Sequence, residues 1–211
     1  MKKMKVAALM AVAAMALSTT AFAAMSGGSI AITADNLTYD GVSGKAEASG
    51  SVVITQDDKT MTGDKGWYNT KTREADLSGG ITMIGNDMSM AASSIHWYDD
   101  ERFTATGSVH LERGGRQIFG DSVDYNTKTE YGSVDGNARL IANGTTLTAN
   151  HVEGWLGQIK AVATGGVTFY NEERNTSGSA DHAVYTQTPG QDDGQVLLTG
   201  SAHVNQNGHL L

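Results

Sequence analysis

Apolar and polar residues alternate along most of this chain, and the alternating segments recur about every 29 residues. Alternation with a period of two is typical of β-strands, because successive side chains point to opposite faces. The repeat frames begin at Ile32, Met61, Met90, Ile118, Leu147 and Gly178. Seven residues after these starts stand Tyr39, Tyr68, Trp97, Tyr125, Gly154 and Tyr185. This recurrence predicts a repeat protein built from one β-unit used six times.

The second half of each unit carries a glycine, a small or polar residue, and then two apolar residues separated by one position. The six copies are Gly50–Ile54, Gly79–Met83, Gly107–Leu111, Gly136–Leu140, Gly165–Phe169 and Gly200–Val204. Turn-forming segments separate the strands, such as Asp40–Ser43 within a unit and Arg113–Arg116 between units. No segment after residue 24 keeps a helical spacing of apolar residues. The pattern therefore predicts an all-β fold of about twelve antiparallel strands.

The repeated glycine predicts a bend in the middle of the returning strand of each hairpin, because a missing Cβ permits a sharp turn there. On the outgoing strand the inward-facing positions change parity at Ala34-Asp35 and at the equivalent places. We expect one extra residue on the outgoing strand to form a bulge at that corner. Each hairpin is then folded into a V, and six stacked hairpins form two sheets that face each other across a trough.

The residues expected to line this trough are mainly aliphatic and methionine side chains, with alanine frequent on the returning strand. Besides Tyr68, the candidate binding residues are Ile32, Leu37, Tyr39, Val52, Ile54, Met61, Ile81, Met83, Met90, Ile95, Trp97, Val109, Leu111, Ile118, Val123, Tyr125 and Leu140. Two interpretations stay open: an ordinary sandwich core, or an under-filled groove that holds acyl chains. Methionine suits both, since it fills cores and also adapts to flexible ligands. The first and last strands are either protected edges or sites of strand pairing.

The first 23 residues have the pattern of a signal peptide. Lys2, Lys3 and Lys5 precede the apolar run 6–17, and Ala21-Phe22-Ala23 supplies the small residues of a cleavage site. The run is shorter than the roughly 20 apolar residues that a membrane-spanning helix needs. We therefore expect export, cleavage after Ala23, and a single domain over residues 24–211.

Composition and charge exclude several classes of function. The 211 residues include 26 glycines, one proline and no cysteine, so disulfides, thiolate metal sites and a catalytic thiol are excluded. The 15 basic and 23 acidic residues give a formal charge of −8, and loss of the leader's three lysines makes it −11. An acidic chain is not typical of a nucleic-acid binder. The six histidines lack metal-ligand spacing, and no catalytic or phosphate-binding motif is present. We expect neither enzyme activity nor a cofactor nor a metal.

The sequence resembles the OstA-like family of periplasmic lipopolysaccharide transport proteins. The resemblance rests on the Ala-Asp-x-Leu-x-Tyr opening at Ala34–Tyr39 and on the six glycine units, and it covers about residues 30–204. It implies a β-jellyroll of V-shaped strands whose interior binds the acyl chains of lipid A.

The resemblance also implies partners. They are an LptC-like inner-membrane protein and an LptD-like outer-membrane protein, joined by edge-strand pairing, with head-to-tail stacking of copies. LptC-like relatives carry a membrane helix and LptD-like relatives a large barrel, so the resemblance favours the free bridge component. The competing hypothesis is a secreted structural or adhesive β-solenoid with a dry core, and a β-helical polysaccharide-degrading enzyme ranks last.

Overall fold

A computed structural model describes residues 30–56, 59–85, 88–98, 101–126, 128–142, 144–155, 158, 160–188, 195–207 and 209–210. The signal peptide expected at residues 1–23 and the start of the expected domain lie outside this part. The described strands are β1 (Ile30–Thr33), β2 (Asn36–Asp40), β3 (Lys45–Gln56), β4 (Lys59–Asn69), β5 (Ala75–Ile84), β6 (Met88–Trp97), β7 (Arg102–Arg113), β8 (Arg116–Asn126), β9 (Tyr131–Ala142), β10 (Thr145–Trp155), β11 (Lys160–Asn171), β12 (Thr176–Thr186), β13 (Gln195–Thr199), β14 (His203–Gln206) and β15 (His209–Leu210).

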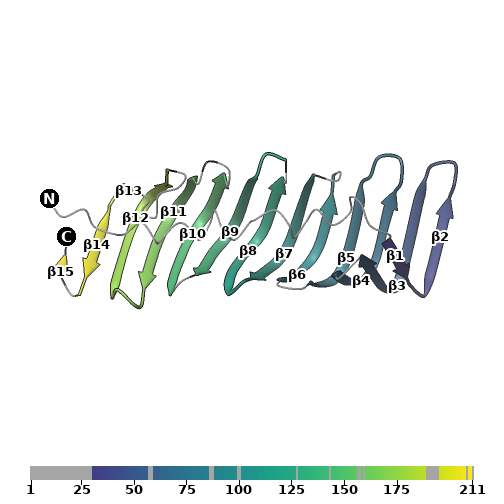
Figure 1. The fold of residues 1–211 in the computed structure, drawn as a ribbon, viewed down its shortest axis with the longest axis horizontal. Helices are drawn as coiled ribbons and strands as arrows, with labels where there is room; N and C mark the ends of the chain where they lie inside the picture. The colour runs from purple at the N-terminus through teal and green to yellow at the C-terminus, as the bar shows by residue number, and fades with distance from the viewer. Residues whose placement is uncertain are drawn as a thin grey trace.

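The described strands form a single antiparallel sheet in which each long strand pairs with its neighbours in the sequence. Figure 1 shows them side by side along the long axis, from β1 and β2 at one end to β13, β14 and β15 at the other. The long strands β3 to β12 have 10 to 12 residues each. β1 with β2, and β13 with β14, supply the two halves of the first and last V-shaped strands. The predicted all-β jellyroll of about twelve strands is confirmed, with the short β15 added.

Each long strand bends once, so that the sheet has two arms. The first arm consists of β2, β13 and the halves of the long strands beside them. The second arm consists of β1, β14 and the other halves. Hydrogen-bond register shifts mark the boundary between the arms in every long pair, for example between Ser49 and Val52 in the pairing of β3 with β4.

The predicted bend at the glycine is confirmed, but the predicted position of the extra residue is wrong. At the corner between β5 and β6, Gly79 and Gly80 of the returning strand together face the single residue Ser93. The same two-to-one arrangement puts Gly136 and Asn137 opposite one residue of β10. The outgoing strand does change parity, but the register shows that the longer path belongs to the glycine strand. A change of parity in the sequence cannot tell which of two paired strands carries the bulge.

Two features explain why glycine stands at each corner. The first is backbone conformation: Gly79 has φ of 98° and Gly136 has φ of 70°, in the left-handed region that side chains disfavour. The second is space. A Cβ at Gly79 would overlap the side chain of Asp64, and one at Gly136 would overlap the carboxylate of Asp121. A small polar residue from the outgoing strand thus lies directly over the glycine, and this contact fixes the corner.

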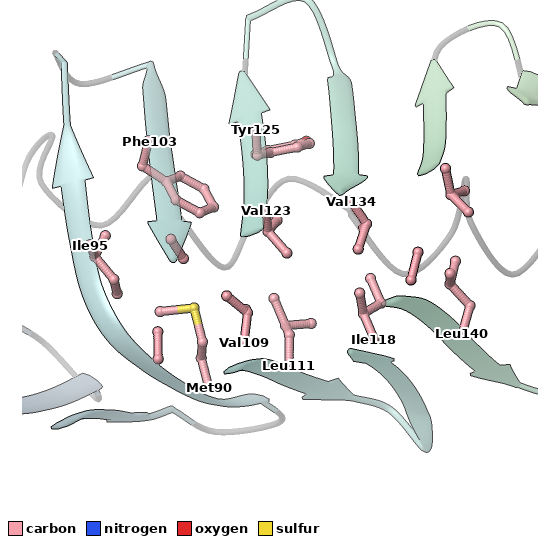
Figure 2. Packing of buried hydrophobic residues seen from close by; sticks show 14 of the residues in the cluster. Met90, Ile95, Phe103, Val109, Leu111, Ile118, Val123, Tyr125, Val134 and Leu140 are labelled. Atoms are coloured by element: carbon pink, nitrogen blue, oxygen red, sulfur yellow. The ribbon is translucent and has the colours of Figure 1, made fainter. Parts of the chain in front are cut away.

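The hydrophobic core is one continuous cluster between the arms. In Figure 2 the side chains of Ile95, Phe103, Val123 and Tyr125 come from the first arm and face Met90, Leu111 and Ile118 of the second. All of these side chains are buried. The apolar residues of the alternating pattern therefore fill the inside of the V, and the polar residues between them lie mainly on the outer faces of both arms.

Candidate functional site

The inside of the V holds most of the candidate binding residues. Thirteen of the seventeen are buried in the common cluster: Val52, Met61, Ile81, Met83, Met90, Ile95, Trp97, Val109, Leu111, Ile118, Val123, Tyr125 and Leu140. Ile32 and Ile54 are partly buried against it, as is Tyr68. Leu37 and Tyr39 are 55% and 63% exposed, because they lie on the edge strand β2, which has a neighbouring described strand on one side only.

An apolar pocket of about 220 Å³ opens at the N-terminal end of the trough. It is lined by Ile32, Leu37, Ala46, Ala48, Val52, Ile54, Gly66, Trp67, Tyr68, Ala75, Asp76, Leu77 and Trp97. Four of these residues are alanine or glycine, so the first arm contributes little volume here. Tyr39, although expected to point inward, is not part of this lining. The pocket therefore exists because small residues on β3, β4 and β5 leave the end of the trough under-filled.

Three methionines form one row of the second arm that begins beside a residue of this pocket. Met61 pairs with Met83, and Met83 pairs with Met90, on the consecutive strands β4, β5 and β6. Ile54, which lines the pocket, pairs with Met61. Unbranched methionine side chains change shape at low cost. The row between the open pocket and the filled middle is therefore built from side chains that can change shape at low cost.

Beyond the methionines the trough is filled by its own side chains as far as the last units. Ile95, Val109 and Ile118 have almost no exposed area. The candidate list ended at Leu140 and omitted further buried residues, namely Phe103 and Val134 before that point and Leu147, Val152, Val167, Phe169 and Tyr185 after it. Most of these occupy the same places in the repeat frame, so the frame itself could have identified them.

In the described part of the chain no charged side chain belongs to the buried cluster inside the V, and Asp76 is the one carboxylate among the residues that line the pocket. The buried polar side chains in the inward register are Thr145, Asn171 and Thr176, and Asn171 donates a hydrogen bond to Thr145 Oγ1 at 2.7 Å. Buried Ser133 instead pairs with Asp124 and Glu153 on the outer face. Burial raises the pKa of Tyr125 to about 12, with a smaller contribution from Glu130, so this phenol stays neutral at ordinary pH. Such an interior suits hydrocarbon and disfavours ionic groups.

Charged side chains pair with one another on the outer faces. Arg102 Nη2 lies 2.8 Å from Asp124 Oδ2, and Lys45 Nζ lies 2.7 Å from Glu47 Oε1. The hydroxyl of Tyr131 donates to Glu153 at 2.8 Å. Burial, with a further contribution from this hydrogen bond, raises the pKa of Tyr131 to about 12. The described residues contain no group of three or more histidine or acidic side chains placed to hold a metal ion. They also contain no helix that is both long and apolar enough to span a membrane.

The two ends of the sheet differ in how their edges are covered. At the N-terminal end β1 and β2 pair with β3 and have no outer neighbour among the described strands. At the C-terminal end β13 pairs with β12 and has no further neighbour among the described strands, whereas β14 pairs with β15 through Asn205 and Gln206. Unpaired backbone amides and carbonyls at such edges are available for strand addition.

Comparisons with known proteins identify the family. No curated protein matches the chain. Among solved structures, LptH, the LptA-homologous periplasmic component of the lipopolysaccharide transport device of Pseudomonas aeruginosa, is 14% identical, with a TM-score of 0.49. That similarity covers 55% of this chain and 96% of LptH. A model of the LptA/(LptD N-terminal domain) lipopolysaccharide transport proteins matches residues 31–130 and 91–211, and the chain belongs to this family.

Proposed function

We propose that this protein carries lipopolysaccharide through the periplasm, with the acyl chains of lipid A shielded inside the V. The observation that carries the proposal is the trough of apolar side chains that ends in an open apolar pocket. Membership of a lipopolysaccharide transport family supports the same ligand. Each CH₂ group removed from water contributes about 0.8 kcal/mol, so the interior can supply the affinity while the acidic surface repels lipid phosphates.

Acyl chains reach the trough first at the N-terminal pocket, because space already exists there. Movement past Met61, Met83 and Met90 then requires the arms to separate or the side chains to rearrange. Hydrogen-bond ladders run along each arm and are interrupted at the corners. The angle between the arms can therefore change without loss of the ladders within either arm.

The protein then acts as a bridge between the two membranes. The free edges β2 and β13 suit strand addition to an LptC-like inner-membrane protein, an LptD-like outer-membrane protein or another copy of this chain. Head-to-tail pairing of copies would continue the trough from one molecule to the next. The signal peptide expected at residues 1–23 directs the chain to the periplasm.

A structural or adhesive β-solenoid is the second candidate. The filled middle of the trough favours it, since Ile95, Val109 and Ile118 pack as they would in a dry core. Under this hypothesis the N-terminal pocket is covered by another protein and never by lipid. The two candidates therefore differ in what contacts Ile54.

Site-specific photo-crosslinking in living cells separates them. A photoreactive residue is placed at Ile54 or Met83, which face inward, and in control variants at the adjacent outward residues Thr55 and Thr82. Lipid transport predicts lipopolysaccharide adducts at the inward positions and none at the outward ones. Absence of adducts at both Ile54 and Met83, with the protein folded and exported, contradicts transport and favours the solenoid.

A further inference from the structure

A second pocket lies on the outer face of the first arm, behind the wall of the apolar pocket. Its volume is about 530 Å³, and seven of its ten lining residues are polar or charged. Ala48, Gly66, Trp67 and Asp76 line both pockets. Because Ala48 and Gly66 are small, the sheet separates the two spaces by little more than its backbone.

The floor of the outer pocket is one cross-strand row centred on an indole ring. Glu47 pairs with Trp67, and Trp67 pairs with Asp76, on the adjacent strands β3, β4 and β5. Lys45 Nζ lies 5.1 Å from the centre of the Trp67 ring and 2.7 Å from Glu47 Oε1. His96 contacts the ring edge-on at a centroid distance of 6.2 Å. These neighbours hold the ring in place, so a ligand would lose little free energy in ordering it.

A second row beside the first supplies short polar side chains. Ser49 pairs with Lys65 and with Asn36, and Lys65 pairs with Ser78. In the described part of the chain these four side chains form no hydrogen bond or ion pair with other protein groups. Further along the same face polar groups are engaged, as Arg102 is with Asp124 and Tyr131 with Glu153. The outer pocket thus combines a fixed aromatic ring with available donors and acceptors.

This combination matches the chemistry of a neutral sugar. A pyranose ring presents C–H groups that stack on an aromatic face and hydroxyl groups that both donate and accept. The carboxylates Glu47 and Asp76 balance the ammonium groups of Lys65 and of Lys45, which is paired with Glu47, so the pocket has no excess of positive charge to favour phosphate. The pocket's volume lies within the range of small-ligand sites, which extends from about 300 to 1,000 Å³.

We propose that this outer pocket is a saccharide site that binds neutral sugar units of the lipid carried in the trough. The inference rests on the proposed function for the source of the sugar. β2 borders both spaces, with Leu37 on the inner side and Asn36 and Thr38 on the outer side. A glycolipid whose acyl chain occupies the inner pocket can pass its sugars around this edge strand to the outer face.

The test is calorimetric titration of the full exported chain with deacylated lipopolysaccharide oligosaccharide, which lacks the acyl chains. We expect weak binding that Trp67→Ala reduces about tenfold and Lys65→Ala reduces less, with Trp67→Phe between wild type and Trp67→Ala. Trp155→Ala is the matched control, because Lys160 Nζ lies 4.9 Å from the Trp155 ring on the same face. Its binding should equal that of the wild type. No binding at millimolar oligosaccharide, or equal loss in Trp67→Ala and Trp155→Ala, overturns the inference.

Two further measurements test whether the bound sugar belongs to the lipid, and they distinguish failure of the saccharide site from failure of the proposed function. An N-acetylglucosamine oligomer provides a glycan unrelated to the lipid, and weaker binding than the oligosaccharide supports the assignment to lipid sugars. Equal or tighter binding of the oligomer overturns that assignment. Lipid crosslinking at Ile54 in the Lys65→Ala background tests the inner pocket separately. If lipid adducts form at Ile54 but the oligosaccharide does not bind, only the saccharide site is refuted. If no lipid adducts form at Ile54 in the protein without Lys65→Ala, the proposed function is refuted.

Discussion

The first unit and the middle units of this sheet share the same corner but differ in how the space inside the V is filled. In both regions an acidic side chain lies over a corner glycine, Asp35 over Gly50 and Asp121 over Gly136. At the first unit the first arm offers Ala46, Ala48 and Gly66, and an apolar pocket remains. In the middle, larger side chains such as Ile95 and Val123 close the same space.

This difference shows that the bend of each strand and the packing inside the V are determined by different residue positions. The corner residues fix the angle of each strand and repeat along the chain. The inward residues of the first arm decide whether a given stretch of trough is open. A repeat can therefore keep its architecture constant while one unit becomes a binding site.

The largest expected effect comes from truncating a side chain in the filled middle. Leu111→Ala should lower the free energy of unfolding by about 3 kcal/mol, because it creates a cavity in close-packed surroundings. Ile54→Ala, beside the open pocket, should cost about 1 kcal/mol, since that side chain is only partly buried. Urea denaturation of both variants gives the two values. Equal losses would mean that the first unit is as tightly packed as the middle.

Corner substitutions should affect the two regions alike. Gly50→Ala and Gly136→Ala both place a Cβ on a backbone with positive φ and against an aspartate. Each should destabilise the fold by about 2 kcal/mol. The midpoints of thermal unfolding provide the comparison. A much smaller loss at Gly50 would show that the corner itself is looser at the open end.

Enlarging a small inward residue should lower stability in the filled middle but lower lipid binding at the open end. Ala105→Leu overfills the closed middle and should cost about 1–2 kcal/mol. Ala46→Leu instead projects into the pocket, leaves stability nearly unchanged, and reduces lipid crosslinking at Ile54. Denaturation and crosslinking yields are measured on both variants. If Ala46→Leu leaves adduct formation intact, the pocket is not where acyl chains bind.

The smallest expected effect is a pH dependence of the filled middle. An unfolded tyrosine releases its proton near pH 10, whereas Tyr125 in the folded chain retains it until about pH 12. Its contribution to stability is complete below pH 10 and declines as the pH rises from 10 to 12. Tyr125→Phe should therefore flatten the alkaline part of the stability curve. Phenolate absorbance and denaturation at several pH values check this, and an unchanged slope would contradict it.

Much of the architecture could be predicted from the sequence because the repeat exposes it. The glycine units located the bends, and period-two alternation identified inward residues such as Met83 and Ile118 correctly. The strand that carries the bulge could not be predicted. A bulge is defined by how two strands pair, and the pattern of a single strand does not show that pairing. The exposure of Leu37 and Tyr39 follows from their place on an edge strand. The pocket depends on the summed volume of facing residues, which no local pattern records.

The central claim is that lipid acyl chains enter at the under-filled N-terminal end. Methyl-labelled protein, titrated with lipopolysaccharide in detergent and followed by intermolecular nuclear Overhauser effects, tests it most directly. The account predicts contacts between acyl protons and the methyl groups of Ile54 and Met61 at the lowest lipid ratios. Contacts at Ile118 and Leu140 should follow only at higher ratios. First contacts at Ile118 or Leu140, or none at Ile54, would contradict the account.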